Sequence, residues 1–511
     1  MANVALVATL TAPLSSDLRE IKELPDSVAW LQWRADLARY SAAARLRSCF
    51  SGKLLYTLQS ERHGGAFAGS PAERHQQLMA AAQHYDLLEL EAETDLTPEL
   101  LQTIPSRKRI ISWNGEACDS AQLHRKFHEF GSVPAHSYCL SFQAESTHDA
   151  LQTLLFLKQL KRQDVAAFCT GPFGLWGRLL SPFFGAPFLF GQPGFQTSAS
   201  GTPSVHRLVA DYGFPALRPL HELYGMVGNK VFHSPSPRLH NTGYRVLNHP
   251  ALFLPFHVER FEDFWRETIL SSEFQSLELP IRGLTIVSPH KEAALAAAEL
   301  HGPIVDRASA TNVFVNKNNK WEAHTTDPES VAFLSEKQNT PGVRPEKRKA
   351  AIIGCGGAGR AIAAALKQLG MDVTLVNRGQ ERGMRASQLL GLPFVSLSEF
   401  KPESFSLLIN ATPVGREDDK LPFAINLLPR DAVVVDLAYG AHTTPLVSGV
   451  EARGGTVVDG YDVVLTQVRK QFQMMTGLEM PHSIGRDDVI AGGPVSTAHS
   501  VHPIELEQEA V

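Results

Sequence analysis

The stretch "KAAIIGCGGAGRAIAAALKQLGMDVTLVNR" (349–378) decides the fold of the C-terminal part of the chain. An apolar run meets a glycine-rich turn, an alanine-rich segment with helical pattern follows, and a second apolar run closes the unit. This is GxGxxG in the strand–turn–helix setting that binds dinucleotides. The glycines let the backbone approach a pyrophosphate, and the helix N-terminus supplies N–H donors. We predict that the turn residues hold a dinucleotide: Gly354, Cys355, Gly356, Gly357, Ala358 and Gly359.

The end of the second strand selects the dinucleotide. NAD sites usually carry Asp or Glu there, to hold the ribose 2′-hydroxyl. This chain has Asn377 and Arg378, with Arg382 one turn further on. Because arginine suits a 2′-phosphate by charge and by bidentate geometry, we predict NADP. The runs 406–415 and 432–440 predict later strands of the same doubly wound sheet, with their carboxyl ends toward the nicotinamide.

The first 216 residues alternate short apolar strands with helical stretches. The expected strands are 4–10, 30–36, 53–60, 85–91, 108–113, 137–142, 165–171 and 187–191. Such alternation predicts a parallel sheet, and eight units in about 220 residues fit a (β/α)8 barrel. A linker is expected at 218–225, a new βα pattern from 224, and a third region near 346, after the polar stretch 335–349. The tail from 481 has no sustained periodicity and is predicted to be mostly disordered.

Composition restricts the classes of function. The chain has 511 residues, enough for two or three domains, and is 43% apolar. A net charge of −5 gives no reason to expect nucleic acid or a membrane as partner. Five scattered cysteines without CxxC spacing predict neither disulfides nor a metal site and fit the reducing cytoplasm. The N-terminus is expected to form a strand rather than a signal peptide, and no apolar run is long enough to span a bilayer.

The segment "VGNKVFHSPSPRLHN" (227–241) places Ser234 and Ser236 two residues apart, each before a proline. In an extended segment alternate side chains point the same way, and the prolines favour extended backbone before them. Both hydroxyls should therefore converge on one point, where they suit a small anion such as a carboxylate. A plain Ser/Pro turn is the alternative interpretation.

The segment "GLTIVSPHKEAALAAAEL" (283–300) predicts a strand followed by a helix that begins at Lys291. An ammonium near a helix N-terminus is disfavoured, so its pKa should fall, which suits a general acid/base. The segment 324–334 puts Asp327 at the next expected helix start. A Lys–Asp pair could exchange a proton with a substrate hydroxyl while a hydride leaves the same carbon. A surface lysine is the alternative interpretation.

Together these stretches resemble shikimate dehydrogenase over about 222–480. The resemblance implies that Ser234 and Ser236 bind the carboxylate of shikimate and that Lys291 and Asp327 are the catalytic pair. In "SATNVFV" (309–315), it implies that Asn312 meets the ring hydroxyls. It further implies an NADP clamp formed by Asn377, Arg378 and Arg382. It implies that Leu437 and Tyr439 line the nicotinamide and the substrate, Leu437 on the cofactor and Tyr439 on the substrate. It also implies a closing segment that folds back onto the substrate domain, with Gly460 at the cofactor and Gln467 at the substrate.

Two positions depart from that family's pattern. Val287 stands where the family usually has threonine, and Asp462 stands where it usually has glycine. Both bear on affinity and substrate choice, so quinate is an alternative substrate. The predicted activity is the reversible NADP-dependent reduction of 3-dehydroshikimate to shikimate, in the pathway to chorismate and the aromatic amino acids.

Residues 1–216 resemble type I 3-dehydroquinate dehydratase, through "LQWRAD" (31–36), "TLQSERHGG" (57–65), "WGRLLS" (176–181) and "SASG" (198–201). The resemblance implies pocket residues at Arg34, Arg178 and Ser198. That family needs a Schiff-base lysine and a proton-shuttling histidine, and their positions fall on Cys139 and Asn114. Two further polar positions of the family pattern carry glutamine, at Gln32 and Gln59.

We therefore predict a barrel that keeps its fold and part of an anion pocket but has lost the lyase chemistry. The alternatives are an enzyme with both activities and a non-catalytic, ligand-sensing scaffold. The predicted α/β architecture is a barrel at 1–217, a shikimate-binding domain at 222–340 completed by 460–480, a Rossmann NADP domain at 346–459, and a tail at 481–511.

Overall fold

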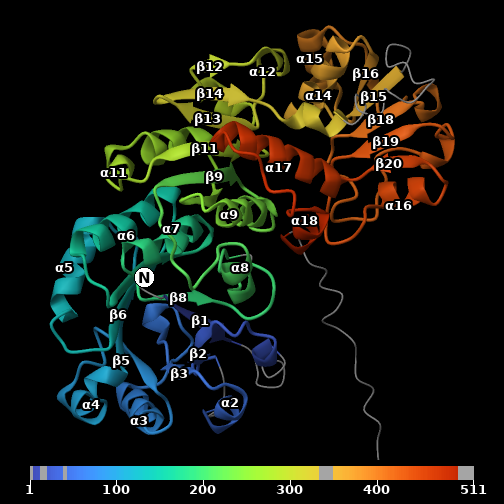
Figure 1. Ribbon diagram of the computed structural model, residues 1–511. Coiled ribbons are helices and arrows are strands. Elements are labelled where there is room, and N and C mark those ends of the chain that lie inside the picture. Colours follow the sequence, from blue (N-terminus) through green and yellow to red (C-terminus); the bar gives the residue numbers. More distant parts are fainter. Residues whose placement is uncertain (1–3, 12–19, 38–42, 199, 333–348, 493–511) are drawn as a thin grey trace, which may run out of the picture. The chain divides into compact units, whose positions relative to one another are not determined.

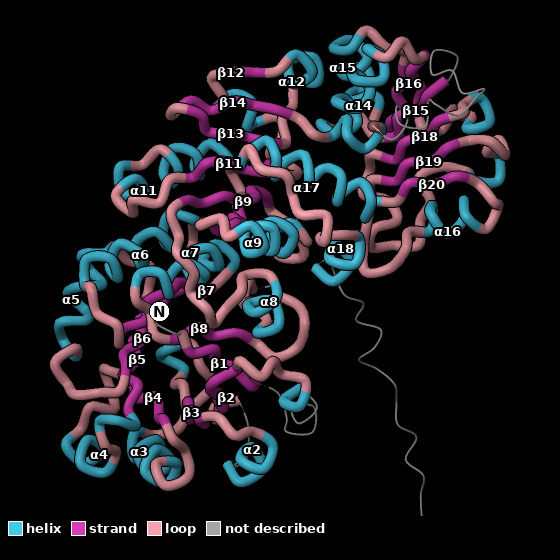
Figure 2. Tube along the Cα trace, viewed as in Figure 1, coloured by secondary structure: helices cyan, strands magenta, loops and turns pink. Residues whose placement is uncertain are grey.

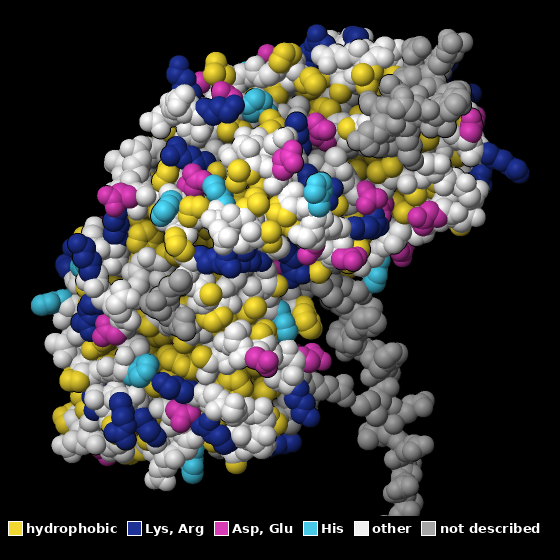
Figure 3. Space-filling view, in the orientation of Figure 1, with side chains coloured by type: hydrophobic (Ala, Val, Ile, Leu, Met, Phe, Trp, Pro, Cys, Tyr) yellow, Lys and Arg dark blue, Asp and Glu magenta, His cyan; other side chains and the backbone are white. Residues whose placement is uncertain are grey.

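The computed structural model describes residues 4–11, 20–37, 43–198, 200–332 and 349–492 (Figure 1). These residues form two compact units. The first comprises the described residues up to Thr325 together with Val468–Ile484, and the second comprises those of Thr326–Gln467 and those from Gly485 onward. Charged side chains of both signs are interspersed on the face that Figure 3 shows. Within the described ranges, no helix has the length and apolar character needed to cross a membrane.

The N-terminal part of the first unit is a nearly closed barrel of eight parallel strands (Figures 1 and 2). The strands lie in the order β7-β6-β5-β4-β3-β2-β1-β8. All eight strand predictions are confirmed, as is the barrel itself. The strands are β1 Ala5–Leu10, β2 Val28–Arg34, β3 Lys53–Thr57, β4 Leu87–Glu91, β5 Arg109–Gly115, β6 Ser137–Gln143, β7 Val165–Thr170 and β8 Phe188–Gly191.

Helices connect these strands, and local sequence explains where they begin. At α3 the Ser70 side chain and the Glu73 side chain bond each other's backbone N–H, and a proline follows the cap. Asp119 and Gln122 form the same reciprocal cap at α5. The helices are α2 Ala43–Cys49, α3 Pro71–Ala81, α4 Pro98–Thr103, α5 Ser120–Phe130, α6 Thr147–Leu160, α7 Leu175–Leu180 and α8 Val205–Ala210.

A second, mixed sheet completes the first unit, in the order β10-β9-β11-β13-β14-β12. Its strands are β9 Glu222–Gly228, β10 Ala251–His257, β11 Ile281–Ile286, β12 Leu300–His301, β13 Val313–Lys317 and β14 Lys320–His324. Its helices are α9 Ser236–Leu247, α10 Phe261–Phe264, α11 Ser272–Gln275 and α12 Pro303–Ala308, and the end of α17 Gly460–Thr476 also belongs to this unit. Because β9 begins at Glu222, the linker predicted at 218–225 is wrong from that residue on.

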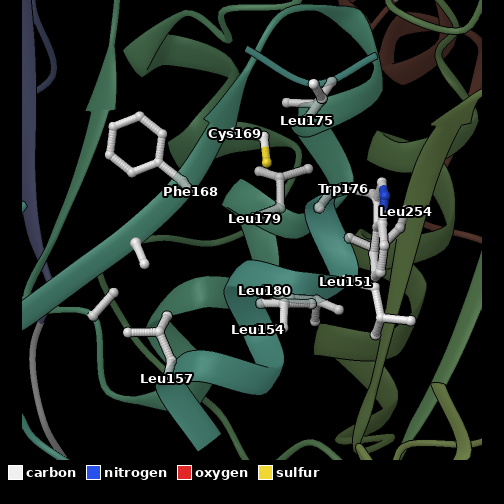
Figure 4. Packing of buried hydrophobic residues seen from close by; sticks show 14 of the residues in the cluster. Leu151, Leu154, Leu157, Phe168, Cys169, Leu175, Trp176, Leu179, Leu180 and Leu254 are labelled. Atoms are coloured by element: carbon white, nitrogen blue, oxygen red, sulfur yellow. The ribbon is translucent and has the colours of Figure 1, made fainter. Parts of the chain in front are cut away.

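The barrel and the second sheet share one hydrophobic core, although the sequence predicts a linker between them. A single cluster of buried residues runs from the barrel strands into β9, β10 and β11. Trp176 on α7 is fully buried at the seam, with its ring 5.4 Å from that of Phe256 and 6.1 Å from that of Phe274. Figure 4 shows Trp176 beside Leu254 of β10. The barrel is thus packed against the second sheet rather than tethered to it.

The second unit contains the predicted doubly wound sheet, in the order β17-β16-β15-β18-β19-β20, all parallel. This strand order is that of a Rossmann fold. The strands are β15 Lys349–Ile353, β16 Asp372–Asn377, β17 Phe394–Ser396, β18 Leu407–Asn410, β19 Val433–Asp436 and β20 Thr456–Val458. The helices are α14 Gly357–Gln368, α15 Gln380–Leu390, α16 Pro445–Glu451 and the first part of α17.

Two predictions about connecting segments fall at the edges of the described residues. The polar stretch 335–349 lies outside them except for its last residue. In the tail predicted to be mostly disordered, the described residues include one helix, α18 Arg486–Gly492. Residues 493–511 lie outside the described residues. The domain boundaries given above stay predictions.

Candidate active site

Several predicted substrate residues gather at the carboxyl ends of β9 and β11. The backbone N–H of Ile286, the last residue of β11, donates to the carbonyl of Asn312 at 2.8 Å. The N–H of Thr311 donates to the carbonyl of Lys291 at 2.9 Å. Val287 directly follows β11. Val287 and Lys291, four residues apart after β11, and the more distant Asn312 therefore occupy one edge of the second sheet.

The two serine hydroxyls converge. Ser234 Oγ donates to Ser236 Oγ at 3.2 Å, the backbone N–H of Ser236 donates to Ser234 Oγ at 3.2 Å, and both side chains are buried. The backbone conformation that brings them together differs from the prediction, because Pro235 is helical (φ −75°, ψ −12°) and Ser236 is the first residue of α9. The extended backbone expected for this segment is therefore wrong. A helix N-terminus adds N–H donors and positive dipole to the hydroxyls, which favours an anion.

Lys291 lies in a turn, and the α-helix predicted to begin there is wrong. A 3-10 helix of five residues, Ala293–Ala297, takes its place. The alanine-rich run favours a helix, but the chain beyond it joins the second sheet, where Leu300 of β12 pairs with Glu322 of β14. Lys291 therefore does not lie at the N-terminus of an α-helix. The turn is anchored instead by buried His290, whose Nε2 lies 2.7 Å from the carbonyl oxygen of Val258.

The sequence reasoning missed two polar residues near this edge. Thr285 Oγ1 on β11 donates to Gln471 Oε1 on α17 at 2.9 Å, and both side chains are buried. Gln471 is one helical turn beyond the predicted Gln467, and that spacing is the signal that could have found it.

Val287, the residue that departs from the family pattern, packs on Gly228. A Cβ added to Gly228 would lie 2.3 Å from Val287 Cγ2.

The glycine turn after β15 has the geometry that its sequence predicts. Gly354 has a positive φ of 109°, and a Cβ on Gly359 would lie 1.9 Å from the Gly354 carbonyl oxygen. Other residue types are excluded at both positions. A Cβ on Gly356, the residue that precedes α14, would meet nothing closer than Arg382 Nη2 at 3.9 Å. The turn thus leaves an open cradle at a helix N-terminus, which fits the pyrophosphate of a dinucleotide.

Asn377, at the end of β16, and Arg382, on α15, lie beside this cradle. The backbone N–H of Cys355 donates to Asn377 Oδ1 at 3.2 Å, so Asn377 holds the glycine turn. Arg378 and Arg382 are exposed. Burial raises the pKa of the Cys355 thiol to about 11, while the nearby Arg360 and Arg382 oppose that rise. The two exposed arginines near the turn suit a phosphate on the ribose.

Asp327 and Gln467 meet within the second unit. Asp327 is buried and begins the 3-10 helix Asp327–Val331, where the sequence predicted a helix start. Gln467 Nε2 on α17 donates to Asp327 Oδ1 at 3.4 Å. The two residues are 140 positions apart, and only the fold brings them together.

A buried network supports the loop after β19, which carries Leu437 and Tyr439. Asp436 accepts hydrogen bonds from Asn410 Nδ2 at 2.8 Å and from Thr444 Oγ1 at 2.6 Å. Burial is the largest influence on this carboxyl and raises its pKa above the ordinary value of 3.8. The network fixes the start of the loop at the carboxyl edge of the sheet.

Gly460 and Asp462 occupy the beginning of α17. A Cβ on Gly460 would lie 2.3 Å from the carbonyl oxygen of Ala438, so close approach of the two segments requires glycine. Asp462 Oδ1 pairs with Arg486 Nη1 of α18 at 2.7 Å, and Asp459 pairs with the same guanidinium. The aspartate that departs from the family pattern therefore holds α18 against α17. A carboxylate in the first turn also suits the helix dipole.

Inside the barrel, four successive strands contribute one polar layer. Thr9 donates to Gln32 Oε1 at 2.7 Å, Gln32 Nε2 donates to Thr57 at 2.9 Å, and Thr57 donates to Glu89 at 2.7 Å. Cys139 of β6 is buried near Glu89 and Arg178, and burial raises the pKa of its thiol well above 9.0. A thiol held protonated is a poor nucleophile.

The barrel has six lysines, and all of them are described residues. None belongs to this polar layer. Lys22 and Lys53 are exposed, and Lys161 follows the end of α6. Lys108 donates to the carbonyls of Ala82 and Tyr85. The ammonium groups of Lys126 and Lys158 pair with Glu93 and Glu278 respectively.

Arg178 is the unusual residue of the barrel interior. Its side chain is buried, its guanidinium lies 4.7 Å from the centroid of the Phe168 ring, and Nη2 donates to the carbonyl of Cys169 at 3.4 Å. Burial lowers its pKa to about 10, and Nε has no hydrogen-bond partner among the described residues. A buried cation that pairs with no carboxylate in the described part of the chain is costly, so this geometry favours an anionic ligand.

The other two predicted pocket residues of the barrel are engaged locally. Arg34 forms a bidentate pair with Asp36, at 2.9 and 2.7 Å. Ser198 Oγ lies 2.8 Å from Ser200 Oγ and accepts from the N–H of Thr202 at 3.0 Å.

His63 is a barrel residue that sequence reasoning did not consider. It lies in the quoted "TLQSERHGG" motif, and its Nδ1 lies 3.1 Å from the carbonyl oxygen of Asn114. It lines a cavity of about 480 Å³ together with Asn114, and it is buried. Among the described residues, no group of three His, Cys, Asp or Glu side chains could hold a metal ion.

A glycine turn on a Rossmann sheet, combined with a second α/β domain that carries paired hydroxyls, defines a dinucleotide-dependent oxidoreductase. Family models match in three segments: type I 3-dehydroquinase over 4–216, the shikimate dehydrogenase substrate binding domain over 226–314, and the D-isomer specific 2-hydroxyacid dehydrogenase NAD binding domain over 312–444. The chain is 32% identical over 274 residues to a shikimate dehydrogenase (NADP(+)) of Thermococcus kodakarensis, covering 53% of this chain and 96% of that protein. The chain belongs to the shikimate dehydrogenase family.

Two further similarities concern the whole chain and the dehydrogenase part. The chain is 24% identical over 454 residues to the chloroplastic bifunctional 3-dehydroquinate dehydratase/shikimate dehydrogenase of Arabidopsis thaliana, covering 84% of this chain and 74% of that protein. A crystal structure of shikimate 5-dehydrogenase from Thermus thermophilus in complex with NADP(H) and shikimate matches with a TM-score of 0.46 and 28% identity, covering 53% of this chain and 99% of that one. The predicted architecture, a dehydroquinase-type barrel fused to a shikimate dehydrogenase, is confirmed.

Proposed function

We propose that this chain catalyses the reversible NADP-dependent reduction of 3-dehydroshikimate to shikimate. The observation that carries the proposal is the buried pair of converging hydroxyls, Ser234 and Ser236, at the start of α9. The same sheet edge carries Lys291 and Asn312. A carboxylate with several ring hydroxyls is the kind of substrate that such a set of donors suits.

Each residue has one role in the proposed reaction. Ser234 and Ser236 donate hydrogen bonds to the substrate carboxylate, and Asn312 binds ring hydroxyls. Lys291 and Asp327 take the proton from the alcohol oxygen during oxidation and return it during reduction. The glycine turn would hold NADP, which when bound would supply the hydride acceptor for oxidation at the same carbon and the hydride donor for reduction. Loss of one proton and one hydride converts the alcohol to the ketone.

The proposed cofactor rests on the glycine turn and on the arginines after β16. Gly354, Gly356 and Gly359 leave room for the pyrophosphate, and Arg378 and Arg382 suit the 2′-phosphate. The Thermococcus relative carries NADP(+) in its name. We propose NADP rather than NAD on these grounds.

For the barrel we propose retention of the fold without imine chemistry. A cysteine cannot form an imine with a ketone, and the Cys139 thiol is protonated and buried. All six barrel lysines are placed elsewhere. Buried Arg178 supports a retained site for an anion. Borohydride with dehydroquinate should leave no adduct on the barrel, and a covalent adduct would instead support an enzyme with both activities.

The test of the dehydrogenase is the growth of NADPH absorbance when shikimate and NADP⁺ are added to the full chain. Lys291→Ala should lower kcat by about 10²–10⁴-fold, because general acid/base groups contribute that much. Lys317→Ala is the matched control, since this lysine of the same sheet pairs with Glu322 at its surface. Binding of shikimate without turnover in the wild type would overturn the proposal and favour a sensing scaffold. Faster oxidation of quinate would change the assigned substrate.

Partners and location follow from charge and cysteine content. We propose a cytoplasmic enzyme whose partners are small molecules, without nucleic acid or membrane, because the net charge is only −5 and the cysteines are free in the described structure. The proposed domain boundaries are those given by the sequence patterns above.

A further inference from the structure

A cluster of buried charges joins the last barrel helix to the segment that carries the serine pair. Asp211, directly after α8, is fully buried. Its Oδ2 accepts from Arg207 Nε at 2.6 Å, and its Oδ1 accepts from Arg238 Nε of α9 at 2.7 Å. The barrel carboxylate of Asp211 thus binds both Arg207 of the barrel and Arg238 of α9, the first helix of the second sheet.

Arg207 also grips the serine segment directly. Its Nη2 donates to the carbonyl of Ser234 at 3.0 Å, and its Nη1 donates to the carbonyl of Phe232. Its side chain is only 7% exposed. One guanidinium therefore joins a barrel carboxylate to two backbone carbonyls, one of which belongs to a proposed carboxylate-binding residue. The planar fork of arginine can satisfy three acceptors at once, which lysine cannot do with fixed geometry.

Two further links join the same parts. His233, between those two carbonyls, lies with Nδ1 3.0 Å from Gln196 Oε1, in the barrel segment after β8. Arg245, seven residues and thus two turns beyond Arg238 on α9, donates to the carbonyls of Ala210 and Asp211 at 2.8 and 3.3 Å. The serine segment and α9 are therefore held to the barrel at several points.

We propose that Arg207 and Asp211 of the barrel are positioning residues for the dehydrogenase, holding Ser234 and Ser236 where they bind the substrate carboxylate. In this chain the barrel serves the reaction of its neighbour, whatever chemistry it has itself lost. The Thermococcus relative, 96% of which aligns with about half of this chain, has no room for such a barrel, so this support belongs to the fused chain. The proposal rests on the proposed function.

The test compares Arg207→Gln and Arg207→Lys with Arg74→Gln in the full chain. Arg74 is the matched control: it is a buried barrel arginine that bonds Asp95 at 2.8 and 2.7 Å and the carbonyl of Leu58, all within the barrel. We expect both Arg207 variants to raise KM for shikimate by about 10- to 100-fold, with KM for NADP⁺ and kcat nearly unchanged, since small misplacements of binding groups cost that much. Arg74→Gln should lower thermal stability without raising KM for shikimate relative to KM for NADP⁺.

Two further readouts separate positioning from general destabilisation. In a Ser234→Ala/Ser236→Ala background, Arg207→Gln should add little to KM, because its target is already removed. Hydrogen exchange of the segment 229–240 should be faster in Arg207→Gln than in the wild type or in Arg74→Gln, which can be measured without any activity. A fully additive effect, equal changes in both KM values, or unchanged exchange would overturn the proposal. Should Arg207→Gln fail to fold, Arg238→Gln, 16% exposed, tests the same cluster.

Discussion

Replacing Trp176 by alanine should destabilise the barrel and the second sheet together. Its indole is fully buried at the seam between them, against Phe256 and Phe274, and its Nε1 donates to the carbonyl of Thr147 at 3.2 Å. A buried aromatic ring removes about 150–250 Å² from water, which at about 25 cal/mol per Å² is worth about 4–6 kcal/mol. Measured tryptophan-to-alanine losses are about 3–5 kcal/mol, so we expect the free energy of unfolding to fall by about 4 kcal/mol.

The assay is urea unfolding of the full chain, followed in parallel by far-ultraviolet circular dichroism and by residual dehydrogenase activity. With an m-value of about 3 kcal/mol/M or more, the midpoint should fall by about 1 M by both measurements. Trp176→Phe keeps a ring at the seam and loses the N–H donor, so it should cost about 1–3 kcal/mol. If the activity midpoint of Trp176→Ala stays at the wild-type value while the dichroism midpoint falls, the shared core does not couple the two parts.

Three other experiments probe the cofactor site, the barrel interior and the loop after β19. Arg378→Ala with Arg382→Ala should raise KM for NADP⁺ by about 10- to 100-fold and leave that for NAD⁺ unchanged, whereas Arg385→Ala, exposed on the same helix, should change neither. Cys139, whose thiol pKa burial raises, should resist alkylation at about pH 8 in the native protein, as mass spectrometry of peptides will show; labelling would contradict its burial. Asp436, whose pKa is raised above 3.8, keeps its proton where the unfolded chain has lost it. Its contribution to stability therefore falls as pH rises from the ordinary pKa of 3.8 through the raised pKa of the folded chain. Asp436→Asn should flatten this fall in urea midpoints measured from about pH 4 upward.

The sequence predicted the elements whose signals are local. The eight barrel strands and the glycine turn follow from alternation, apolar runs and residue types that few other structures tolerate. The prediction failed where tertiary contacts outweigh local propensity. The alanine-rich run after Lys291 forms only a short 3-10 helix, because the following residues pair with β14. Similarly, α18 forms in a stretch without periodicity, held by the pairs of Arg486 with Asp459 and Asp462.

By itself, the sequence determined the residue types of the candidate site and the order of the βα units, since these depend on side-chain chemistry and hydrophobic period. Only the tertiary structure decided that Gln467 meets Asp327, that Ser236 begins a helix, and that a barrel arginine holds the Ser234 carbonyl. The glutamine and arginine contacts join residues distant in the chain, and no local pattern encodes a distance across a packed core. The arginine contact exists because one continuous apolar core brings the barrel against the second sheet, where the buried charges must find partners.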